Sequence, residues 1–141
     1  MADSTSNPPR FDAGAALPAL RILVGLGTWL APGPSWRTFG LGPMHGNASA
    51  GLITRLFGVR DLALGLAARH PAVEVRRAAL QIGVAVDSVD AVATLLAVRA
   101  GAPKPSLLGV GLGAALFTGL GLVALQGLEA PSEGAGRLGA C

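Results

Sequence analysis

The sequence contains few of the residue types on which polar protein chemistry depends. Of its 141 residues, 13% are charged, two are histidine, one is cysteine and none is tyrosine. The single cysteine, Cys141, excludes an intrachain disulfide and a cysteine metal cluster. No Ser/His/Asp, Cys/His or metal-ligand spacing is present, which excludes most hydrolase and metal-dependent mechanisms. We therefore expect neither a metal site nor a cofactor.

The basic charge of the chain does not indicate nucleic-acid binding. The formal net charge is +3, but the eleven Lys and Arg residues are scattered singly, apart from the pair Arg76 and Arg77. A nucleic-acid interface requires a basic patch or stripe, usually with aromatic side chains between the charges. The sequence has no such stripe, and we expect no nucleic-acid partner.

The apolar residues, in contrast, form four long and largely apolar runs. Soluble domains carry about 25% charged residues, whereas this chain carries 13%. Its apolar residues make up 51% of the chain, and its mean hydropathy is +0.55. Each run is long enough to cross a bilayer at about 1.5 Å per residue. The sequence predicts an all-α fold, a four-transmembrane-helix bundle with up-down topology. The alternative is a soluble helical bundle with an unusually apolar core. The predicted spans are residues 14–31, 48–69, 78–98 and 107–128.

The remaining segments of the chain are expected to connect or flank the spans. Residues 14–128 form the predicted membrane domain, between flexible tails at 1–13 and 129–141. The Gly/Pro-rich loop 32–47 either lies on the membrane surface or folds back over a cavity mouth. Residues 107–128 contain no ionisable side chain and are predicted to be scaffold. Small residues recur there at four-residue spacing, which suits close helix packing: Gly109 with Gly113, and Ala114 with Thr118.

Six charged residues lie inside the predicted spans. A charge near the bilayer centre costs about 2.5–3.5 kcal/mol on insertion scales, so such residues face a partner or a polar cavity. Counted along each span, all six fall within a slab less than about 10 Å thick. We therefore expect the first three spans to converge on a shared polar interior. The six residues are Arg21, Arg55, Arg60, Asp61, Asp87 and Asp90.

Helical spacing predicts how these side chains are directed. Arg21 shares one face with Gly25 and Thr28, and Asp87 shares another with Asp90. The three charges of the second span, at residues 55, 60 and 61, spread around the helix instead. One of them is expected to face the fourth span, a second protomer or the membrane surface.

The charged residues admit a functional and a purely structural interpretation. An ion-pair network could simply fix helix register, but well-packed apolar residues often replace buried pairs without loss of stability. The sequence therefore favours a polar site that binds, and by acid–base chemistry converts, a lipophilic small molecule such as an isoprenoid, quinone-like or epoxide compound. Asp87, Asp90 and Asp61 are the candidate catalytic acids, and Arg21, Arg55 and Arg60 the candidate ligand-binding residues.

Two further function classes stay open at this point. One is proton-coupled or ion transport, which would require a homo-oligomer because four helices are few for a monomeric pathway. The other is an accessory subunit whose charges pair with the helices of a partner membrane subunit. Whether the protein is an enzyme is not determined by its sequence.

The segment from Arg55 to Gly65, RLFGVRDLALG, followed by Asp87 and Asp90 in the next span, carries a family resemblance. It resembles a family of small four-helix membrane proteins common in actinobacteria and catalogued as a domain of unknown function. The resemblance implies the same four-span layout and no particular activity. The Lys-poor, Ala/Gly-rich composition also suits such a genome.

These observations lead to an expected location and orientation. We expect an integral protein of the bacterial inner (plasma) membrane, in contact with membrane lipids. Four spans place both termini on one side, and that side carries more basic residues than the other. An excess of Lys and Arg marks the cytoplasmic side, so both termini are expected to be cytoplasmic.

Overall fold

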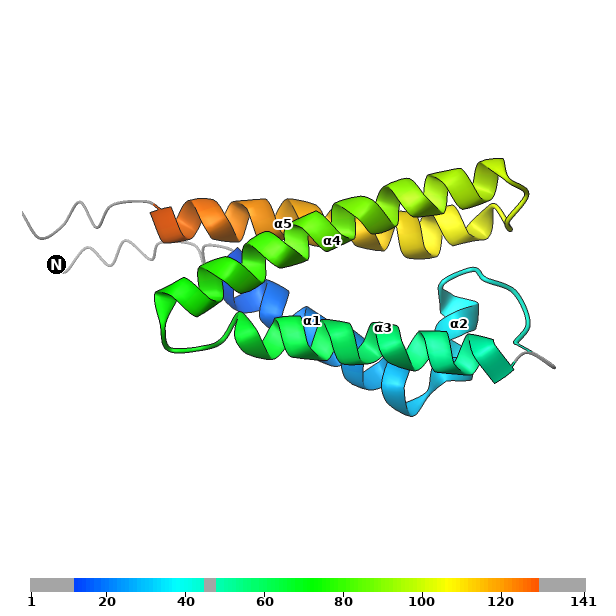
Figure 1. The fold of residues 1–141 in the computed structure, drawn as a ribbon, viewed down its shortest axis with the longest axis horizontal. Helices are drawn as coiled ribbons and strands as arrows, with labels where there is room; N and C mark the ends of the chain where they lie inside the picture. The colour runs from blue at the N-terminus through cyan, green and yellow to red at the C-terminus, as the bar shows by residue number, and fades with distance from the viewer. Residues whose placement is uncertain (1–11, 45–47, 130–141) are drawn as a thin grey trace, which may run out of the picture.

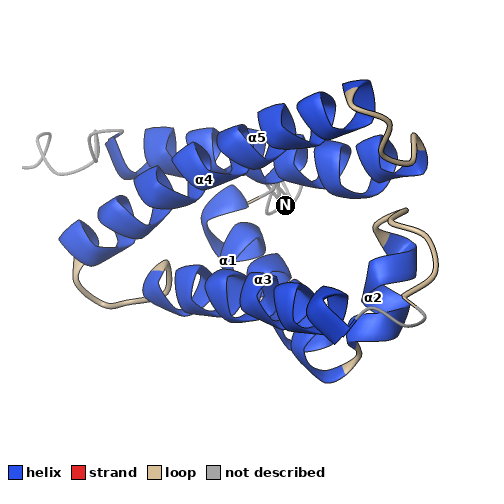
Figure 2. Cartoon of the chain, turned by 45° about the vertical axis from the view of Figure 1, so that its right-hand side comes forward, coloured by secondary structure: helices blue, strands red, loops and turns tan. Residues whose placement is uncertain are grey.

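All regular structure in the described part of the chain is helical (Figure 2). The computed structural model describes residues 12–44 and 48–129. This confirms the predicted all-α class. The elements are α1 (Ala13–Leu30), α2 (Pro32–Thr38), α3 (Ala48–Ala67), α4 (Val73–Arg99), the π-helical turn η1 (Leu107–Gly111) and α5 (Leu112–Glu129).

Three of the described helical segments are long and apolar enough to cross a membrane. They are α1, α4 and the continuous segment Leu107–Glu129, which contains η1 and α5. Their outer surfaces carry large apolar side chains, among them Leu23, Val89 and Leu108, each about two-thirds exposed. Exposed apolar surface on this scale is typical of contact with lipid or another protein. These features indicate an integral membrane protein.

The long helices are arranged in two pairs (Figure 1). In both views α1 lies beside α3, and α4 lies beside α5. The start of α1, the α3–α4 connection and the end of α5 gather at one end of the molecule. The short helix α2 and the turn between α4 and η1 lie at the opposite end.

Glycine allows α1 and α3 to approach closely. A Cβ atom at Gly25 would lie 2.7 Å from the carbonyl oxygen of Gly58, and one at Gly58 would lie 2.7 Å from that of Gly25. The sequence predicts close helix packing within residues 107–128, and there a Cβ at Gly121 of α5 would lie 2.6 Å from Cγ2 of Val84 on α4. There Gly109 does contact the backbone of Phe39, but a Cβ at Gly113 would meet nothing within 4 Å.

The region 32–47, predicted to be a loop, begins with helix α2. Pro32 and Pro34 end α1 as expected, yet both occupy the first turn of α2. The first backbone N–H groups of a helix have no acceptor within it, so proline is tolerated there. His45 lies outside the described residues.

Several predicted boundaries also move. Helix α4 begins at Val73 rather than at residue 78, so the predicted basic turn is already helical. Pro18 lies in the second turn of α1. At the inner ends of the predicted tails, Ala13 and Glu129 are helical, while residues 1–11 and 130–141 are outside the described part.

The apolar core lies at the end of the bundle that holds the start of α1 and the end of α5. Its buried residues come from α1, α4, α5 and the residue that directly follows α3. The core residues are Leu17, Ala68, Ala79, Leu80 and Ala124.

The α1–α3 glycine contact predicts the effect of adding one methyl group. Gly58→Ala should lower the free energy of unfolding by about 1–3 kcal/mol, because the methyl group would overlap the backbone of α1. Thermal unfolding in detergent, followed by tryptophan fluorescence, measures this change. Gly27→Ala is the matched control, since a Cβ there meets nothing within 4 Å. Equal stability of the two variants would contradict the contact.

Candidate functional site

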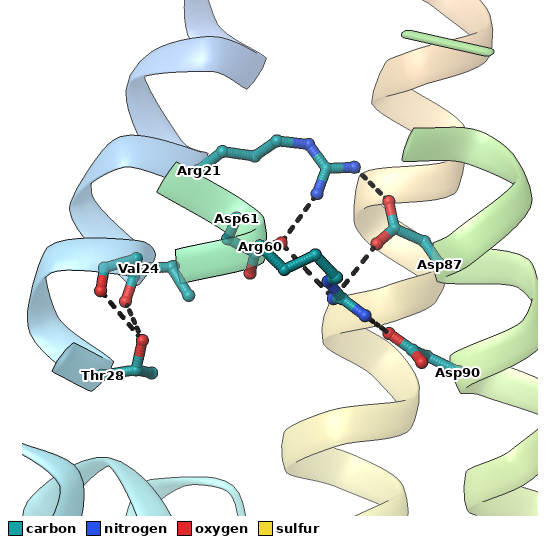
Figure 3. Close-up of polar contacts among 8 residues, drawn as sticks. Arg21, Val24, Thr28, Arg60, Asp61, Asp87 and Asp90 are labelled. Atoms are coloured by element: carbon teal, nitrogen blue, oxygen red, sulfur yellow. Dashed lines mark hydrogen bonds and ion pairs between the residues drawn. The ribbon is translucent and has the colours of Figure 1, made fainter. Parts of the chain in front are cut away.

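Five of the six predicted site residues meet in one cluster of ion pairs (Figure 3). Arg21 on α1 donates to Asp61 on α3 at 3.0 Å and also to Asp87 on α4. Arg60 on α3 donates to Asp90 on α4 at 2.6 Å and to Asp61 at 3.4 Å. A longer ion pair of 3.9 Å joins Arg60 to Asp87. We call these five residues the Arg/Asp cluster.

Four members of the Arg/Asp cluster form a closed ring of alternating charge. The order is Arg21, Asp61, Arg60, Asp87 and back to Arg21, with Asp90 attached to Arg60. Arg21 and Asp87 are almost fully buried, whereas the side chains of Arg60 and Asp90 are 28% and 19% exposed. The ring therefore lies inside the bundle, and its Arg60–Asp90 edge reaches the surface.

The helical spacing noted in the sequence accounts for much of this geometry. Arg21 and Thr28 are both buried on one face of α1, and Asp87 and Asp90 lie on the face of α4 that meets the arginines. Gly83, one turn before Asp87, makes room for Arg21, because a Cβ there would lie 2.9 Å from its Nη2 atom.

The neighbouring residues Arg60 and Asp61 serve two different interfaces. Asp61 accepts a hydrogen bond from Arg21 on α1, while Arg60 reaches across to Asp90 on α4. Adjacent residues of a helix point in different directions, but the side chain of Arg60 is long. Its guanidinium can therefore also reach back to Asp61. Helix α3 is thereby connected to both of its neighbours.

Arg55 is the predicted site residue that the fold leaves out of the cluster. It is exposed and makes no ion pair with another described residue. Its Nη1 atom lies beside Gly51, one turn nearer the start of α3. Long basic side chains near the ends of membrane helices extend toward the interface in this way.

Aromatic residues that the sequence did not single out cover both arginines. The guanidinium carbon of Arg21 lies 4.8 Å from the ring centre of Phe117, and that of Arg60 lies 4.6 Å from Phe57. Phe57 precedes Arg60 by three positions, so helical spacing could have identified it. No sequence signal linked Phe117 to Arg21. Helix α5 is therefore more than the scaffold that its lack of charge suggested.

Two polar atoms of the Arg/Asp cluster are buried without a hydrogen-bond partner among the described residues. They are Oδ1 of Asp87 and Nε of Arg60. Leaving a buried donor or acceptor unsatisfied costs about 1–3 kcal/mol, and more for a charged group. The cluster also contains three aspartates against two arginines, a formal excess of one negative charge.

The Arg/Asp cluster forms the floor of a cavity of about 300 Å³. Arg60, Asp61, Asp87 and Asp90 all line it, and the rest of its wall is mostly apolar. Pockets for small molecules combine an apolar lining with a few convergent polar groups in the same way.

The segment around α2 closes one end of this cavity. Trp36, Phe39 and Leu41 line it, opposite Ser106 and Gly109 from the segment that follows α4. The described part of this region, residues 32–44, therefore folds back over the cavity mouth. The positive φ of Gly40, 70°, allows the sharp bend that brings this loop onto the backbone of Pro105.

The side of the cavity between α3 and α4 is open to the molecular surface. Ile53 and Phe57 of α3 line the cavity and are 46% and 38% exposed. Ala97 of α4 lines it and is also exposed. These residues lie on the same side as the partly exposed Arg60–Asp90 edge of the cluster. A molecule in the surrounding lipid could therefore reach the charged floor laterally.

The arrangement can bind a ligand, whereas the described residues offer no group suited to a metal. No set of three or more His, Cys, Asp or Glu side chains in residues 12–44 and 48–129 is placed to hold an ion. Each carboxylate of the cluster already contacts an arginine. The roles of Asp61, Asp87 and Asp90 as acids and of Arg21, Arg55 and Arg60 as ligand-binding groups stay predictions.

Comparison with known proteins does not identify a function for this site. No family model, no curated protein and no solved structure matches the chain.

The burial of Arg21 predicts a large stability difference between two arginine variants. Arg21→Leu should lower the free energy of unfolding by about 3–5 kcal/mol, because it leaves Asp61 and Asp87 without their main partner. Arg55→Leu should change it by about 0.5 kcal/mol or less, since Arg55 is exposed. Thermal unfolding of both purified variants measures the difference. Tolerance of Arg21→Leu would show that the ring contributes little to stability.

Proposed function

We propose that the protein crosses the membrane four times, in an up-down bundle, with α3 as the fourth span. At 20 residues α3 is about 30 Å long, which matches the hydrocarbon thickness of a bilayer. Its outer face carries Leu52, Leu56 and Leu66, each more than half exposed. Arg60 and Asp61, two of the three charged residues of α3, pair with residues of α1 and α4. The family resemblance, the inner-membrane location and the cytoplasmic termini belong to this proposal.

Within that bundle, we propose that the cavity binds a lipophilic small molecule whose polar group meets the Arg/Asp cluster. The observation that carries this proposal is an apolar cavity ending on buried charges, one of which, Asp87, keeps an oxygen without a hydrogen-bond partner. A network needed only for helix register would gain nothing from an adjoining cavity. A ligand group that hydrogen-bonds to Asp87 would satisfy that oxygen.

The lateral opening between α3 and α4 supports a ligand that partitions into lipid. An apolar molecule would approach through the bilayer, and its polar group would meet the partly exposed Arg60–Asp90 edge first. Chemical conversion is a further step of the same proposal. Asp90 is the best-placed proton donor, because it lines the cavity and is the most exposed of the three aspartates.

Proton-coupled or ion transport is the second candidate function. The formal excess of one carboxylate in the cluster favours it, because a transported cation or proton could balance that charge. Purified protein in liposomes would then give a pH-dependent flux that the Asp90→Asn variant lacks. Absence of flux at all protein-to-lipid ratios would remove transport and leave ligand binding.

An accessory role with a partner subunit is tested by purification alone. A protein that is stable and monodisperse without a partner argues against this role.

Filling the cavity tests ligand binding directly. Gly113 lines the cavity, and a Cβ there meets nothing within 4 Å, so Gly113→Leu should occupy cavity space without backbone overlap. We expect it to weaken binding of the neutral fluorophore N-phenyl-1-naphthylamine by about tenfold or more, a loss of about 1.4 kcal/mol. Fluorescence titration in lipid nanodiscs, corrected with empty nanodiscs, measures the affinity.

Gly119→Leu provides the matched control for this experiment. Gly119 lies on the same helix, is exposed, and would place its side chain outside the cavity. Its affinity should equal that of the unmodified protein. Equal affinities of all three proteins would mean that the fluorophore does not occupy this cavity, and an absence of saturable binding would count against the proposed function.

A further inference from the structure

We propose that the ligand of the cavity is an amphiphilic cation, a protonated amine attached to an apolar body. This inference rests on the proposed function, because it specifies the chemical class that the same cavity binds. Three independent observations support it: the charge of the cluster, the use of its hydrogen-bonding atoms and the composition of the cavity wall.

The charge of the Arg/Asp cluster favours a positive ligand. The six predicted charges would have balanced, but Arg55 lies outside the cluster, which leaves Arg21 and Arg60 against three aspartates. An uncompensated charge is costly in a medium of low dielectric constant. A bound cation next to the cluster would restore neutrality, whereas an anion would double the imbalance.

The terminal nitrogens of the two arginines also select against an anion, and the guanidinium donor left without a partner, Nε of Arg60, is a single buried N–H. Both terminal nitrogens of Arg21 and both of Arg60 already face carboxylate oxygens. An anionic ligand would have to displace an aspartate to reach them. In contrast, Oδ1 of Asp87 is a buried acceptor with no hydrogen-bond partner among the described residues, and its side chain is only 1% exposed. It is 3.9 Å from the nearest nitrogen of Arg60.

Aromatic side chains are concentrated on the cavity wall. The chain has two tryptophans and four phenylalanines, and four of these six residues line the cavity: Trp36, Phe39, Phe57 and Phe117. Aromatic faces attract cations through their quadrupole, most strongly where water is excluded. Phe57 and Phe117 already serve the arginines in this way. Trp36 and Phe39 line the end closed by α2, where they would contact the apolar body of a ligand whose cationic group lies against the cluster.

A matched series of three ligands separates charge from shape. The series is 2-naphthylmethylammonium, 2-naphthylmethanol and 2-naphthalenesulfonate, which share an aromatic group and differ in charge. We expect the unmodified protein in nanodiscs of neutral lipid to bind the cation about tenfold more tightly than the alcohol, and the alcohol more tightly than the anion. Naphthalene fluorescence anisotropy, corrected with empty nanodiscs, measures the three affinities.

The charge variant Asp90→Asn provides the second arm of the experiment. Asp90 lies at the partly exposed edge of the cluster and makes a single ion pair, with Arg60. Its neutralisation removes the excess negative charge, so affinity for the cation should fall about tenfold while affinity for the alcohol stays within about twofold. Glu74→Gln on the same helix is the matched control, since Glu74 is exposed and does not line the cavity. It should leave all three affinities unchanged.

The possible outcomes distinguish this inference from the proposed function on which it rests. Equal binding of cation and alcohol, with both sensitive to Gly113→Leu, would overturn the cation inference and keep the cavity as a binding site. Tightest binding of the sulfonate would also overturn it and would assign recognition to the arginines. Failure of all three compounds to bind saturably would count against the proposed function as well. The ranking of the three affinities is measured on the unmodified protein, so this ranking does not depend on the folding of any variant.

Discussion

The structure depends on one electrostatic constraint, which is that charges removed from water must be paired. Within the bundle Arg21 can lie inside only because Asp61 and Asp87 meet it from two other helices. Each of these contacts crosses a helix interface, so the ring cannot close unless α1, α3 and α4 take their observed relative positions. Removing Arg21 would leave the buried Asp61 and Asp87 without their main partner, which is more costly than never having buried the charges.

The Arg/Asp cluster links the two helix pairs and thereby produces the cavity. Both arginines come from the α1–α3 pair, which glycine holds in close contact at Gly25 and Gly58. The aspartates Asp87 and Asp90 come from α4 in the other pair. On one side of the cluster the pairs meet through an apolar core. On the other side they are separated by the cavity, and the segment around α2 closes its far end.

Helical spacing predicted which helix faces turn inward at the site. It did not predict which of the charged residues belong to the cluster. The spacing of Arg21 with Thr28, and of Asp87 with Asp90, correctly identified the faces that are turned inward. Arg55 and Arg60 are alike in sequence terms, since both are arginines on the same span. Their different positions result from the direction in which each leaves α3, and from the presence of Asp90 within reach of Arg60 alone. Helix α2 was missed because its prolines, read as terminators of α1, also suit the first turn of a new helix.

The sequence by itself determined the class of the protein and the kind of residue at its centre. Apolar runs of this length form membrane helices because a bilayer leaves no other way to satisfy the backbone, and charges within them must turn inward. Only the tertiary structure decided which charges meet and that three aspartates face two arginines. It also decided that Phe117 of an uncharged helix lies over Arg21. The physical reason is that periodicity along one helix specifies a face, whereas a partner on another helix is specified by packing over the whole chain.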